Sequence, residues 1–583
     1  MCGINGLLRL TDTSPALDRD ELLRTRDAMA ARGPDGWGAW MSPDGRAALA
    51  SRRLAILDLS EAGAQPMLSE DGRLAVVMNG EIYNFLELRR ELEAQGARFR
   101  SRSDTEVVLA LYAREGAAML SRLRGMYGLA LWDAREKTLL LARDPLGIKP
   151  LYVSEAGGIL RFASQVKALE AGGAVSREVD PAGLAGFLLW GSVPEPLTIR
   201  KAVRALPAGH HLIVQDGRIG EPRPQGPAPS DIDPMEPAAA VEDSVVAHLV
   251  SDVPVAVFLS AGLDSGLIAA LARRHLPEPP ATFTLSFEET AGTPLDEAPL
   301  AAEVARVLGT RHVERRVSRA DFQGWWQGAL AAMDQPSIDG FNTWAVSRAA
   351  HEAGLKVVLS GLGGDEVFGS YPSFQDVPRL ARTARRAARV PGLGALWPPV
   401  ARTFFRDRPK LAGLLRYGRT LPGAYFLRRG LFLPEELPGL MGRDAAEEAL
   451  RRYDPVAGSD GASGDAWTAV HELETARYMR NQLLRDSDWA SMASSVELRV
   501  PLVDAWLRER LAARGFEPAR SQGKAALVRQ AAPELPAALW SRPKTGFYIP
   551  IAEWLRPELA AKRLGERSRA LALGVLEGWG VGV

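Results

Sequence analysis

The feature that most restricts the fold is an alternation of apolar strands and helices between residues 238 and 361. Runs such as VPVAVFL, TFTLSF and LKVVLSG alternate with helical stretches such as SGLIAALARRHL and LDEAPLAAEVARVLG. Strands that are apolar along their whole length are buried on both faces, and the intervening helices return the chain to the same end of the sheet. This part is therefore predicted to be a doubly wound parallel α/β sheet, followed from about residue 375 by a mainly helical part.

A proline-rich segment, EPRPQGPAPSDIDPMEP at residues 221–237, precedes this alternation and is interpreted as a linker. It divides the chain into predicted domains of residues 1–220 and 238–583. The first domain has short strands such as RLAVVMNGEIYNF, helices that begin after Asp18 and at Asp104, and hairpin-type pairs. These pairs are Asp44-Gly45, Asp71-Gly72 and Asp216-Gly217. The pattern predicts layered sheets.

Charge and composition exclude several classes of function. Lys plus Arg and Asp plus Glu both number 71, so we expect neither a nucleic-acid nor a membrane partner. Thirteen basic residues fall in 379–429 against one acidic residue, Asp407, and solvated helical faces are the favoured interpretation. We expect no signal peptide and no membrane span. The single cysteine excludes an internal disulfide and fits a cytoplasmic location.

That single cysteine is Cys2, directly after the initiator methionine. A free cysteine is most often a small buried hydrophobic residue. Removal of Met1, however, would place a thiol and a free α-amine on one residue, which then supplies both nucleophile and base. The position of Cys2 therefore suggests a catalytic nucleophile.

Four residues of the first domain fit such a nucleophile. In MNGEIYN, Asn79 and Gly80 offer a side-chain amide and a backbone N–H for a tetrahedral oxyanion. Arg53 and Asp104 could hold the carboxylate and the ammonium of an α-amino acid. Taken alone, Asp104 is interpreted as a helix N-cap. Together with Cys2, these residues predict a site for an amino acid with a cleavable side chain.

Two strand–loop–helix segments predict a phosphate site. In FLSAGLDSG, the residues from Ser260 to Ser265 join a strand to a helix whose N-terminus can bind an anion. In VVLSGLGGDEVFGSY, a second strand ends in Ser360 to Gly364, followed by Asp365. Neighbouring parallel strands would bring both loops to the carboxyl edge of the sheet. Asp264 and Asp365 could there share a Mg²⁺ ion bound to ATP phosphates.

Ten motifs, in order, resemble the glutamine-hydrolysing asparagine synthetases over nearly the whole chain. They are MCGI, RGPDG, RLAILD, NGEIYN, SDTEV, RDPLGIKPLY, SDVPVAVFLSAGLDS, SGLGGDEVFGSY, SSVELRVPLVD and RPKTGFYIP. The resemblance implies an N-terminal-nucleophile αββα sandwich with glutaminase activity, joined to an ATP-pyrophosphatase synthetase domain. The implied reaction converts aspartate to asparagine through an acyl-adenylate, with glutamine as the source of ammonia and with ATP and Mg²⁺. A homodimer of this chain is a further expectation.

The resemblance also implies roles for individual residues. Cys2 would attack glutamine, Asn79 and Gly80 would hold the oxyanion, and Lys524 would stabilise charge at the adenylation centre. The implied glutamine-binding residues are Arg53, Leu54, Glu81 and Asp104. The implied ATP-binding residues are Leu259, Ser260, Gly262, Leu263, Asp264, Ser265, Leu285, Ser360 and Gly361.

Three departures from the family pattern concern the synthetase half. Ala261 stands where the loop usually has glycine, Leu362 where a glutamate is common, and QPSIDGFNTW at 335–344 lacks an arginine found nearby in family members. Aspartate remains the predicted acceptor, with Arg348 or Lys524 as the replacement cation. The alternative is another carboxylic acid, such as a uronic acid of a polysaccharide or a natural-product acid. An inactive relic is disfavoured because both predicted residue clusters are present.

Overall fold

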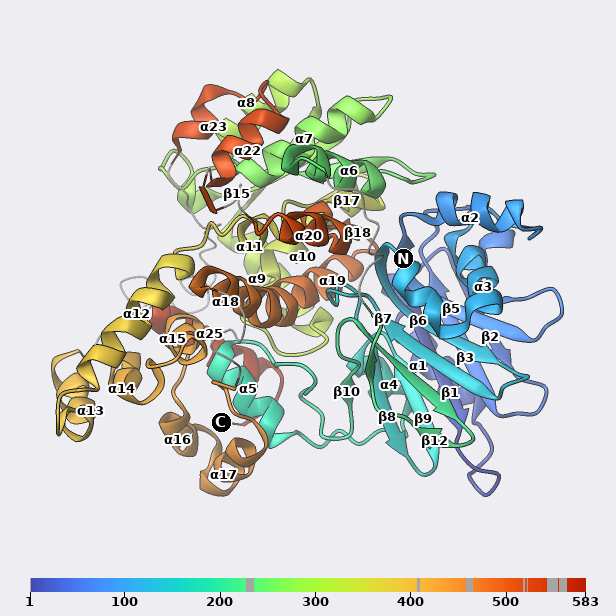
Figure 1. Cartoon of the computed structure of the whole chain (residues 1–583), viewed down its shortest axis with the longest axis horizontal. Helices are drawn as coiled ribbons and strands as arrows, with labels where there is room; N and C mark the ends of the chain where they lie inside the picture. The colour runs from blue at the N-terminus through green and yellow to red at the C-terminus, as the bar shows by residue number, and fades with distance from the viewer. Residues whose placement is uncertain are drawn as a thin grey trace.

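The computed structural model describes residues 2–226, 235–405, 409–457, 465–516, 520–521, 523–542, 554 and 564–582. Figure 1 shows a β-rich part, drawn in blue and cyan, beside a larger part that combines a parallel sheet with many helices. The N-terminus lies where the two parts meet, so the predicted nucleophile is at their junction rather than on an outer face.

The β-rich part is a sandwich of two antiparallel sheets. The first has the order β10-β8-β9-β1-β3-β2, and its strands are β1 (Cys2–Arg9), β2 (Gly36–Met41), β3 (Ala47–Arg53), β8 (Tyr152–Ala156), β9 (Ile159–Ala163) and β10 (Arg204–Ala205). The second has the order β12-β11-β7-β6-β5-β4, with β13 beside β11; its strands are β4 (Met67–Leu68), β5 (Leu74–Ile82), β6 (Gly125–Asp133), β7 (Thr138–Arg143), β11 (His210–Gln215), β12 (Arg218–Ile219) and β13 (Arg223–Pro224). Apolar side chains such as Ile4, Leu49 and Leu141 fill the space between the sheets.

Helices cover both outer faces of this sandwich. The helices are α1 (Arg19–Asp27) and α4 (Val166–Gly172) on the first sheet, and α2 (Phe85–Ala94) and α3 (Asp104–Glu115) on the second. The predicted αββα sandwich is therefore confirmed. Asp18 caps α1 as expected, but the N-cap of α3 is Ser103, so the interpretation of Asp104 as a cap is wrong. The Asp104 carboxylate instead accepts a hydrogen bond from the Ile82 amide, at 2.9 Å.

The predicted parallel sheet is also present, with the order β16-β15-β14-β17-β18. Its strands are β14 (Val255–Phe258), β15 (Ala281–Phe287), β16 (Arg311–Val317), β17 (Val357–Leu359) and β18 (Glu497–Arg499). One face packs against α6 (Pro237–His248), α7 (Leu263–His275), α8 (Ala298–Leu308), α20 (Ala505–Ala513) and α22 (Gly523–Ala531). The other packs against α9 (Arg319–Ala332), α10 (Phe341–Glu352) and α19 (Arg485–Met492).

The edge strand β18 is a correction to the expectation that strands end near residue 375. It has only three residues, and its buried Glu497 and Arg499 pair with each other across 2.5 Å. A strand that buries a charged pair lacks the apolar signal from which strands are predicted. The remaining helices are α11 (Gly364–Val367), α12 (Ser373–Ala387), α13 (Leu393–Phe404), α14 (Leu414–Tyr417), α15 (Leu421–Arg429), α16 (Leu437–Met441), α17 (Arg443–Arg452), α18 (Ala466–Leu473), the π-helical stretch Glu474–Leu484, α23 (Ala537–Ser541) and α25 (Leu564–Gly578).

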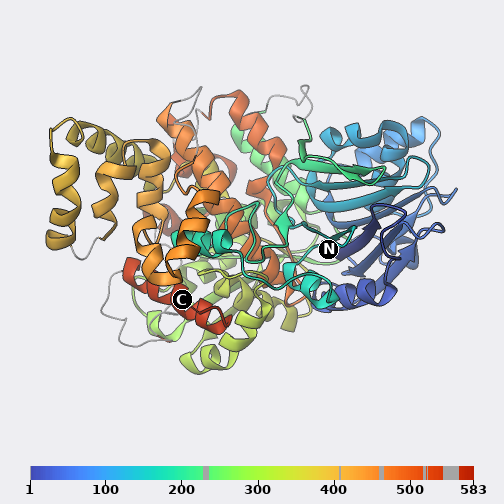
Figure 2. The same ribbon diagram turned by 90° about the horizontal axis from the view of Figure 1, so that it is seen from below.

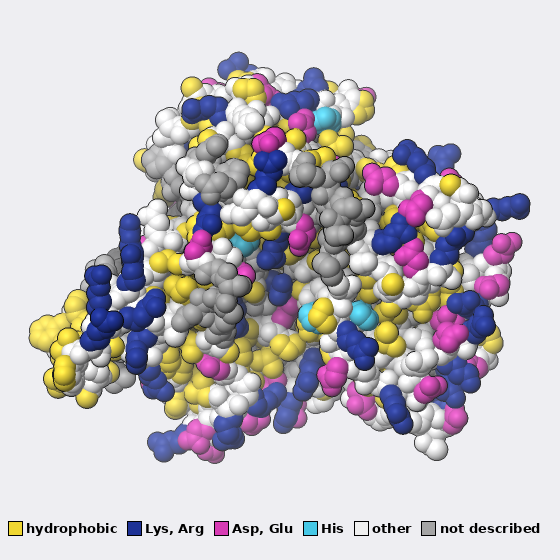
Figure 3. Space-filling model, in the orientation of Figure 1, with side chains coloured by type: hydrophobic (Ala, Val, Ile, Leu, Met, Phe, Trp, Pro, Cys, Tyr) yellow, Lys and Arg dark blue, Asp and Glu magenta, His cyan; other side chains and the backbone are white. Residues whose placement is uncertain are grey.

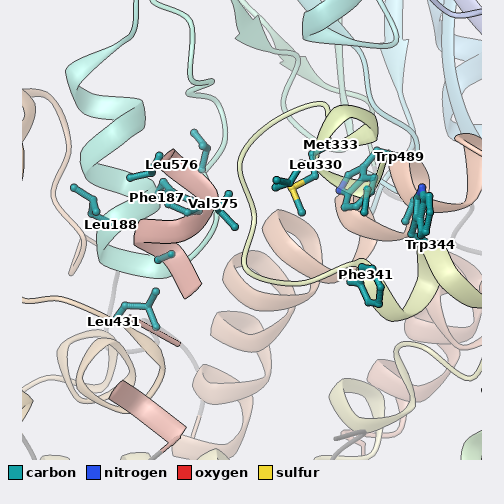
Figure 4. Packing of buried hydrophobic residues seen from close by; sticks show 14 of the residues in the cluster. Phe187, Leu188, Leu330, Met333, Phe341, Trp344, Leu431, Trp489, Val575 and Leu576 are labelled. Carbon is teal, nitrogen blue, oxygen red and sulfur yellow. The ribbon is translucent and has the colours of Figure 1, made fainter. Parts of the chain in front are cut away.

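Helix α5 (Pro181–Trp190) connects the two parts through packing. Its sequence precedes the proline-rich segment, yet Phe187 and Leu188 lie in one core with Leu431, Val575 and Leu576 of the larger part (Figure 4). The helix is apolar all round, as expected for a helix buried on several sides. The domain boundaries remain a prediction, and residues 227–234 of the predicted linker lie outside the described residues.

Helices α12, α13 and α14 form the end of the molecule farthest from the sandwich (Figures 1 and 2). Leu396 and Phe404 of α13 are exposed, and Figure 3 shows this hydrophobic tip next to basic side chains. The basic residues Arg379, Arg382 and Arg386 of α12 are exposed, in agreement with solvated helical faces. Within the described residues, no helix combines the length and apolar character that crossing a membrane requires.

Candidate functional site: a buried thiol and a loop at the edge of the parallel sheet

Cys2 lies in the first strand of the sandwich, paired with Arg53 of β3. Its side chain is almost completely buried, and burial raises the pKa of the thiol, while Arg53 and the Leu54 amide act in the opposite direction. The backbone N–H of Cys2 donates to Asn79 Oδ1 across 3.2 Å. Met1, whose removal would free this nitrogen as an amine, lies outside the described residues.

Asn79 and Gly80 stand beside the thiol on β5. With its Oδ1 occupied by Cys2, the fully buried Asn79 still has an Nδ2 group without a hydrogen-bond partner among the described residues. A buried unsatisfied donor is costly, so this amide is suited to a ligand oxygen. At Gly80 the φ angle is +156°, and a Cβ would lie 1.9 Å from the Met126 carbonyl oxygen, so only glycine fits there.

The arginine and the aspartate predicted to hold an amino acid have different surroundings. Arg53 donates to the backbone carbonyls of Leu57, Asp58 and Ser60, so its guanidinium orders the loop after β3. Asp104, at the start of α3, is buried, and burial raises the pKa of its carboxyl group. The structure brings Arg53 and Leu54 next to the thiol and leaves Asp104 at the end of β5, near Glu81.

Glu81 faces the larger part of the molecule. Its carboxylate lies 3.7 Å from the Arg499 guanidinium of β18. Burial, with the nearby charges of Glu497 and Asp104, raises the pKa of Glu81 well above its usual range, and Arg499 opposes this shift. Glu81 thus lies on the side of the thiol that faces the larger part of the molecule.

Gln65 was missed by sequence reasoning. Its side-chain amide Nε2 donates to Thr105 Oγ1 at 3.2 Å and approaches the Cys2 sulfur at 3.9 Å, while its Oε1 accepts from the Met78 amide. It therefore fixes β5 and α3 around the thiol. The only sequence signal is the Gln-Pro pair itself, which a turn explains equally well.

The second predicted cluster lies at the carboxyl edge of the parallel sheet. Strands β14 and β17 are direct neighbours with Val257 opposite Leu359, so the loops that follow them meet as predicted. Ser260 and Ser265 hydroxyl groups lie 2.8 Å apart and fold the first loop onto the start of α7. The N-cap Gly262 provides no side-chain cap, so the amides at this helix N-terminus can bind an anion.

The two loops touch so closely that glycine is required between them. A Cβ on Gly361 would lie 2.8 Å from the Ser265 nitrogen, and one on Gly364 would lie 2.4 Å from the Asp264 carboxylate. Both predicted metal ligands bind Lys524 of α22: its Nζ lies 2.6 Å from Asp264 Oδ2 and 2.6 Å from Asp365 Oδ1. These carboxylates raise the pKa of Lys524 although burial lowers it.

This donor set fits a nucleotide with a divalent cation. Mg²⁺ in such sites takes one or two carboxylates and completes its shell with water and substrate phosphates. Asp264 and Asp365 supply that number of carboxylates, and the described residues contain no cluster of three or more potential metal ligands. The residues therefore fit a metal that arrives with phosphates.

A cavity of about 310 Å³ opens beside these loops. Of the residues predicted to bind ATP, Leu263 does not line it and packs instead against the core beneath α7. Those that line it are Leu259, Ser260, Gly262, Asp264, Ser265, Leu285, Ser360 and Gly361. The cavity thus combines an apolar wall with a helix N-terminus, as a nucleotide requires.

Comparison with known proteins decides the family. Residues 1–223 match the family model described as "Glutamine amidotransferase domain", and residues 237–575 match that described as "Asparagine synthase". Asparagine synthetase 1 (glutamine-hydrolyzing) of Bacillus subtilis is 30% identical, with 96% of this chain and 88% of that protein covered. This chain belongs to the asparagine synthetase family.

Two further relatives have different names, one an asparagine synthetase and the other an amidase. Asparagine synthetase B (glutamine-hydrolyzing) of Escherichia coli is 33% identical, with 67% of this chain and 68% of that protein covered. Amidase chry2 of Gibberella zeae is 32% identical, with 87% of this chain and 82% of that protein covered.

The departures from the asparagine synthetase pattern can now be located. Ala261 is buried and does not line the cavity, whereas Leu362 does. Arg348 pairs with Glu352 at 3.0 Å and lies over Trp325, outside the cavity lining, so it is not the replacement cation in this conformation. The RPKTGFYIP motif falls almost entirely, at residues 543–550, outside the described part of the chain.

Arg32 links the two parts of this asparagine synthetase family member through a hydrogen bond and an ion pair. Arg32 Nε donates to the Cys2 carbonyl, and its two terminal nitrogens bind both carboxylate oxygens of Asp488 on α19, at 2.7 and 3.0 Å. Lys149 adds a second cation 3.6 Å from Asp488. Burial opposes ionisation, but these cations hold the pKa of Asp488 below its usual range.

Proposed function

We propose that this chain transfers the amide nitrogen of glutamine to a carboxylic acid that it activates with ATP. The observation that carries the proposal is the presence of two centres on one chain. In the first, the Cys2 N–H is bound to Asn79, whose Nδ2 has no partner among the described residues, and in the second, Asp264, Lys524 and Asp365 form a cluster at the sheet edge. One centre suits acyl transfer through a thioester, and the other suits chemistry on phosphates.

At the first centre, the Cys2 sulfur attacks the side-chain carboxamide of glutamine. Asn79 Nδ2 and the Gly80 N–H stabilise the oxyanion, and the α-amine freed by loss of Met1 delivers a proton to the leaving ammonia. Arg53, Leu54, Glu81 and Asp104 form the proposed glutamine-binding residues. Water then hydrolyses the thioester to glutamate.

At the second centre, the acceptor carboxylate attacks the α-phosphorus of ATP, and pyrophosphate leaves. The α7 N-terminus and Lys524 bind the phosphate charge, while Leu259 and Leu285 pack against the nucleotide base. Mg²⁺ held by Asp264 and Asp365 would supply further positive charge to the phosphates. Ammonia then attacks the acyl-adenylate carbon and AMP leaves.

Aspartate is the first candidate acceptor, because the names of the relatives specify asparagine synthesis. A second candidate, another carboxylic acid, is favoured by a specific observation: Leu362 lines the cavity where family members commonly carry a glutamate, and Arg348 is turned away.

The test compares nitrogen sources in Cys2→Ala. Amide formation from glutamine should fall by at least about 1,000-fold, since the nucleophile is lost, while formation from added ammonium should stay within a few-fold of wild type. Pyrophosphate release and amide product are measured with each source. Loss of the ammonium-dependent reaction in a folded variant would refute the division of labour between the two centres.

A further inference from the structure

The cavity beside the phosphate loops has a second wall. Asp339 precedes Gly340, the N-cap of α10, and Asp486 lies on α19; both line the cavity together with polar and apolar neighbours. The neighbours are Gly340, Asn342, Thr343, Leu483 and Ser487. Because the first wall carries the residues proposed for the nucleotide, this second wall is the part of the cavity that is available to the acceptor acid.

Among the described residues, the two carboxylates of this wall accept hydrogen bonds from neutral donors. Asp339 accepts from the Gly340 amide at 2.8 Å and from the Gln482 side chain at 3.5 Å. Asp486 accepts from the Ser337 hydroxyl at 2.5 Å and from the Trp489 indole N–H at 2.9 Å. Their hydrogen bonds orient them without cancelling their charge.

No Lys, Arg or His is found among the described residues that line this cavity. Lys524 is bound to Asp264 and Asp365 on the side of the first wall. Arg485 is near enough to favour ionisation of Asp486, but it does not line the cavity. Its Nη1 donates to the Val193 carbonyl at 2.6 Å, and its Nη2 has no hydrogen-bond partner among the described residues. Burial, with the charge of Asp339, still raises the pKa of Asp486 to about 7. The wall therefore has an excess of negative charge that a cation would relieve.

We propose that the acceptor is a carboxylic acid that carries an ammonium or guanidinium group and no second carboxylate, with its cation bound by Asp339 and Asp486. This inference rests on the proposed function and narrows the substrate class. The reacting carboxylate points toward the nucleotide, and the cation points toward the second wall.

Aspartate matches this wall only in part. Its ammonium could bind Asp339, but its second carboxylate would have to be buried beside Asp339, Asp486 and the apolar Leu362. A buried anion without a cationic partner is disfavoured, and the carboxylates of Asp339 and Asp486 would repel it. An acid with a single carboxylate avoids that cost.

The experiment uses three acids with the same chain of methylene groups: δ-aminovalerate, hexanoate and adipate, which end in an ammonium, a methyl and a carboxylate. Lysine, arginine and aspartate are added as amino acids of different charge. Glutamine- and ATP-dependent pyrophosphate release is measured with the full chain. The cationic acids should be used with a kcat/KM at least about tenfold above that of hexanoate, adipate and aspartate.

Substitutions separate recognition of the cation from general damage. Asp339→Asn should raise the KM for the preferred cationic acid about tenfold or more, leave the KM for ATP unchanged, and narrow the gap between δ-aminovalerate and hexanoate. Asp486→Asn should act in the same direction. The matched control is Asp376→Asn, which removes an exposed carboxylate of α12 that pairs with Arg428.

Two results would overturn the inference. Preference for adipate or aspartate over every cationic acid would refute the cationic acceptor and leave the proposed function standing. No pyrophosphate from any of these acids, by a chain that still hydrolyses glutamine, would also refute the cationic acceptor, whereas the proposed function is refuted separately, by the test with Cys2→Ala.

Discussion

The two centres differ in how strongly their side chains are charged. Cys2 is almost completely buried, and the carboxamides of Asn79 and Gln65 contact its N–H and its sulfur, while the charges of Arg53 and Glu81 lie nearby. Around Asp264, by contrast, a lysine and two carboxylates converge at a helix N-terminus. We infer that the thiol centre depends on burial and strand geometry, whereas the second centre depends on charge. Removing one charge should therefore affect the two centres unequally.

The largest effect is expected from Lys524→Met. Loss of the cation that joins Asp264 and Asp365 should lower pyrophosphate release by at least about 100-fold with either nitrogen source, because charge developing on the phosphates is no longer stabilised. Glutamine hydrolysis, assayed as glutamate release, should stay within a few-fold of wild type.

Arg529→Met is the matched control, because Arg529 lies on the same helix and is exposed. It should leave both reactions unchanged. If Lys524→Met impaired glutamine hydrolysis as strongly as pyrophosphate release, the proposed independence of the thiol centre from the charge of the second centre would be wrong.

A smaller effect, on stability, is expected from Arg32→Met. Of the cations that pair with Asp488 in the described part of the chain, Lys149 would remain, and breaking a buried ion pair typically costs about 3–5 kcal/mol. The free energy of unfolding is measured by denaturant titration of full-length protein. Glutamine hydrolysis should fall as well, because Arg32 also binds the Cys2 carbonyl.

Arg46→Met provides the comparison, since Arg46 pairs with the exposed Asp12. Surface pairs of this kind contribute less than about 1 kcal/mol. Equal destabilisation by the two substitutions would show that the buried contact between the halves has no special role.

The smallest effect is expected from Ala261→Gly, which restores the residue usual in the family. Because Ala261 is buried and does not line the cavity, the KM for ATP should change by less than about threefold. Stability should fall by about 0.5–1 kcal/mol from added backbone freedom in the unfolded chain. A tenfold gain in ATP affinity would mean that the methyl group does restrict the phosphate loop.

Residues close in the sequence made much of both centres predictable. The strand–loop–helix pattern around Ser260 and Ser360 predicts the sheet edge where the two loops meet, and the structure has β14 beside β17. Hairpin pairs such as Asp71-Gly72 likewise mark real turns, with Gly72 at a φ of +68°. Local chemistry is sufficient in these cases because the chain itself brings the residues together.

Contacts between the halves could not be predicted in the same way. Arg32 and Asp488 are 456 positions apart, and nothing local distinguishes them from surface charges. Gln65 reaches Cys2 and Thr105 only after β5 and α3 pack. Helix α5 and strand β18 were also missed, the first because it is apolar all round and the second because it buries a charged pair.

Helix α5 limits how this chain can be recombined with its relatives. Consider a hybrid that joins the first 220 residues of one family member to the remainder of another. The residues at positions 187 and 188 would then come from one protein, and the core residues that they contact, at positions 431 and 576, from the other. Core packing tolerates such mismatched shapes poorly. Engineers who wish to exchange the N-terminal module should therefore keep Pro181–Trp190 of the recipient. The strands on both sides of α5 should come from the donor, because β10 and β11 complete the two sheets of the sandwich.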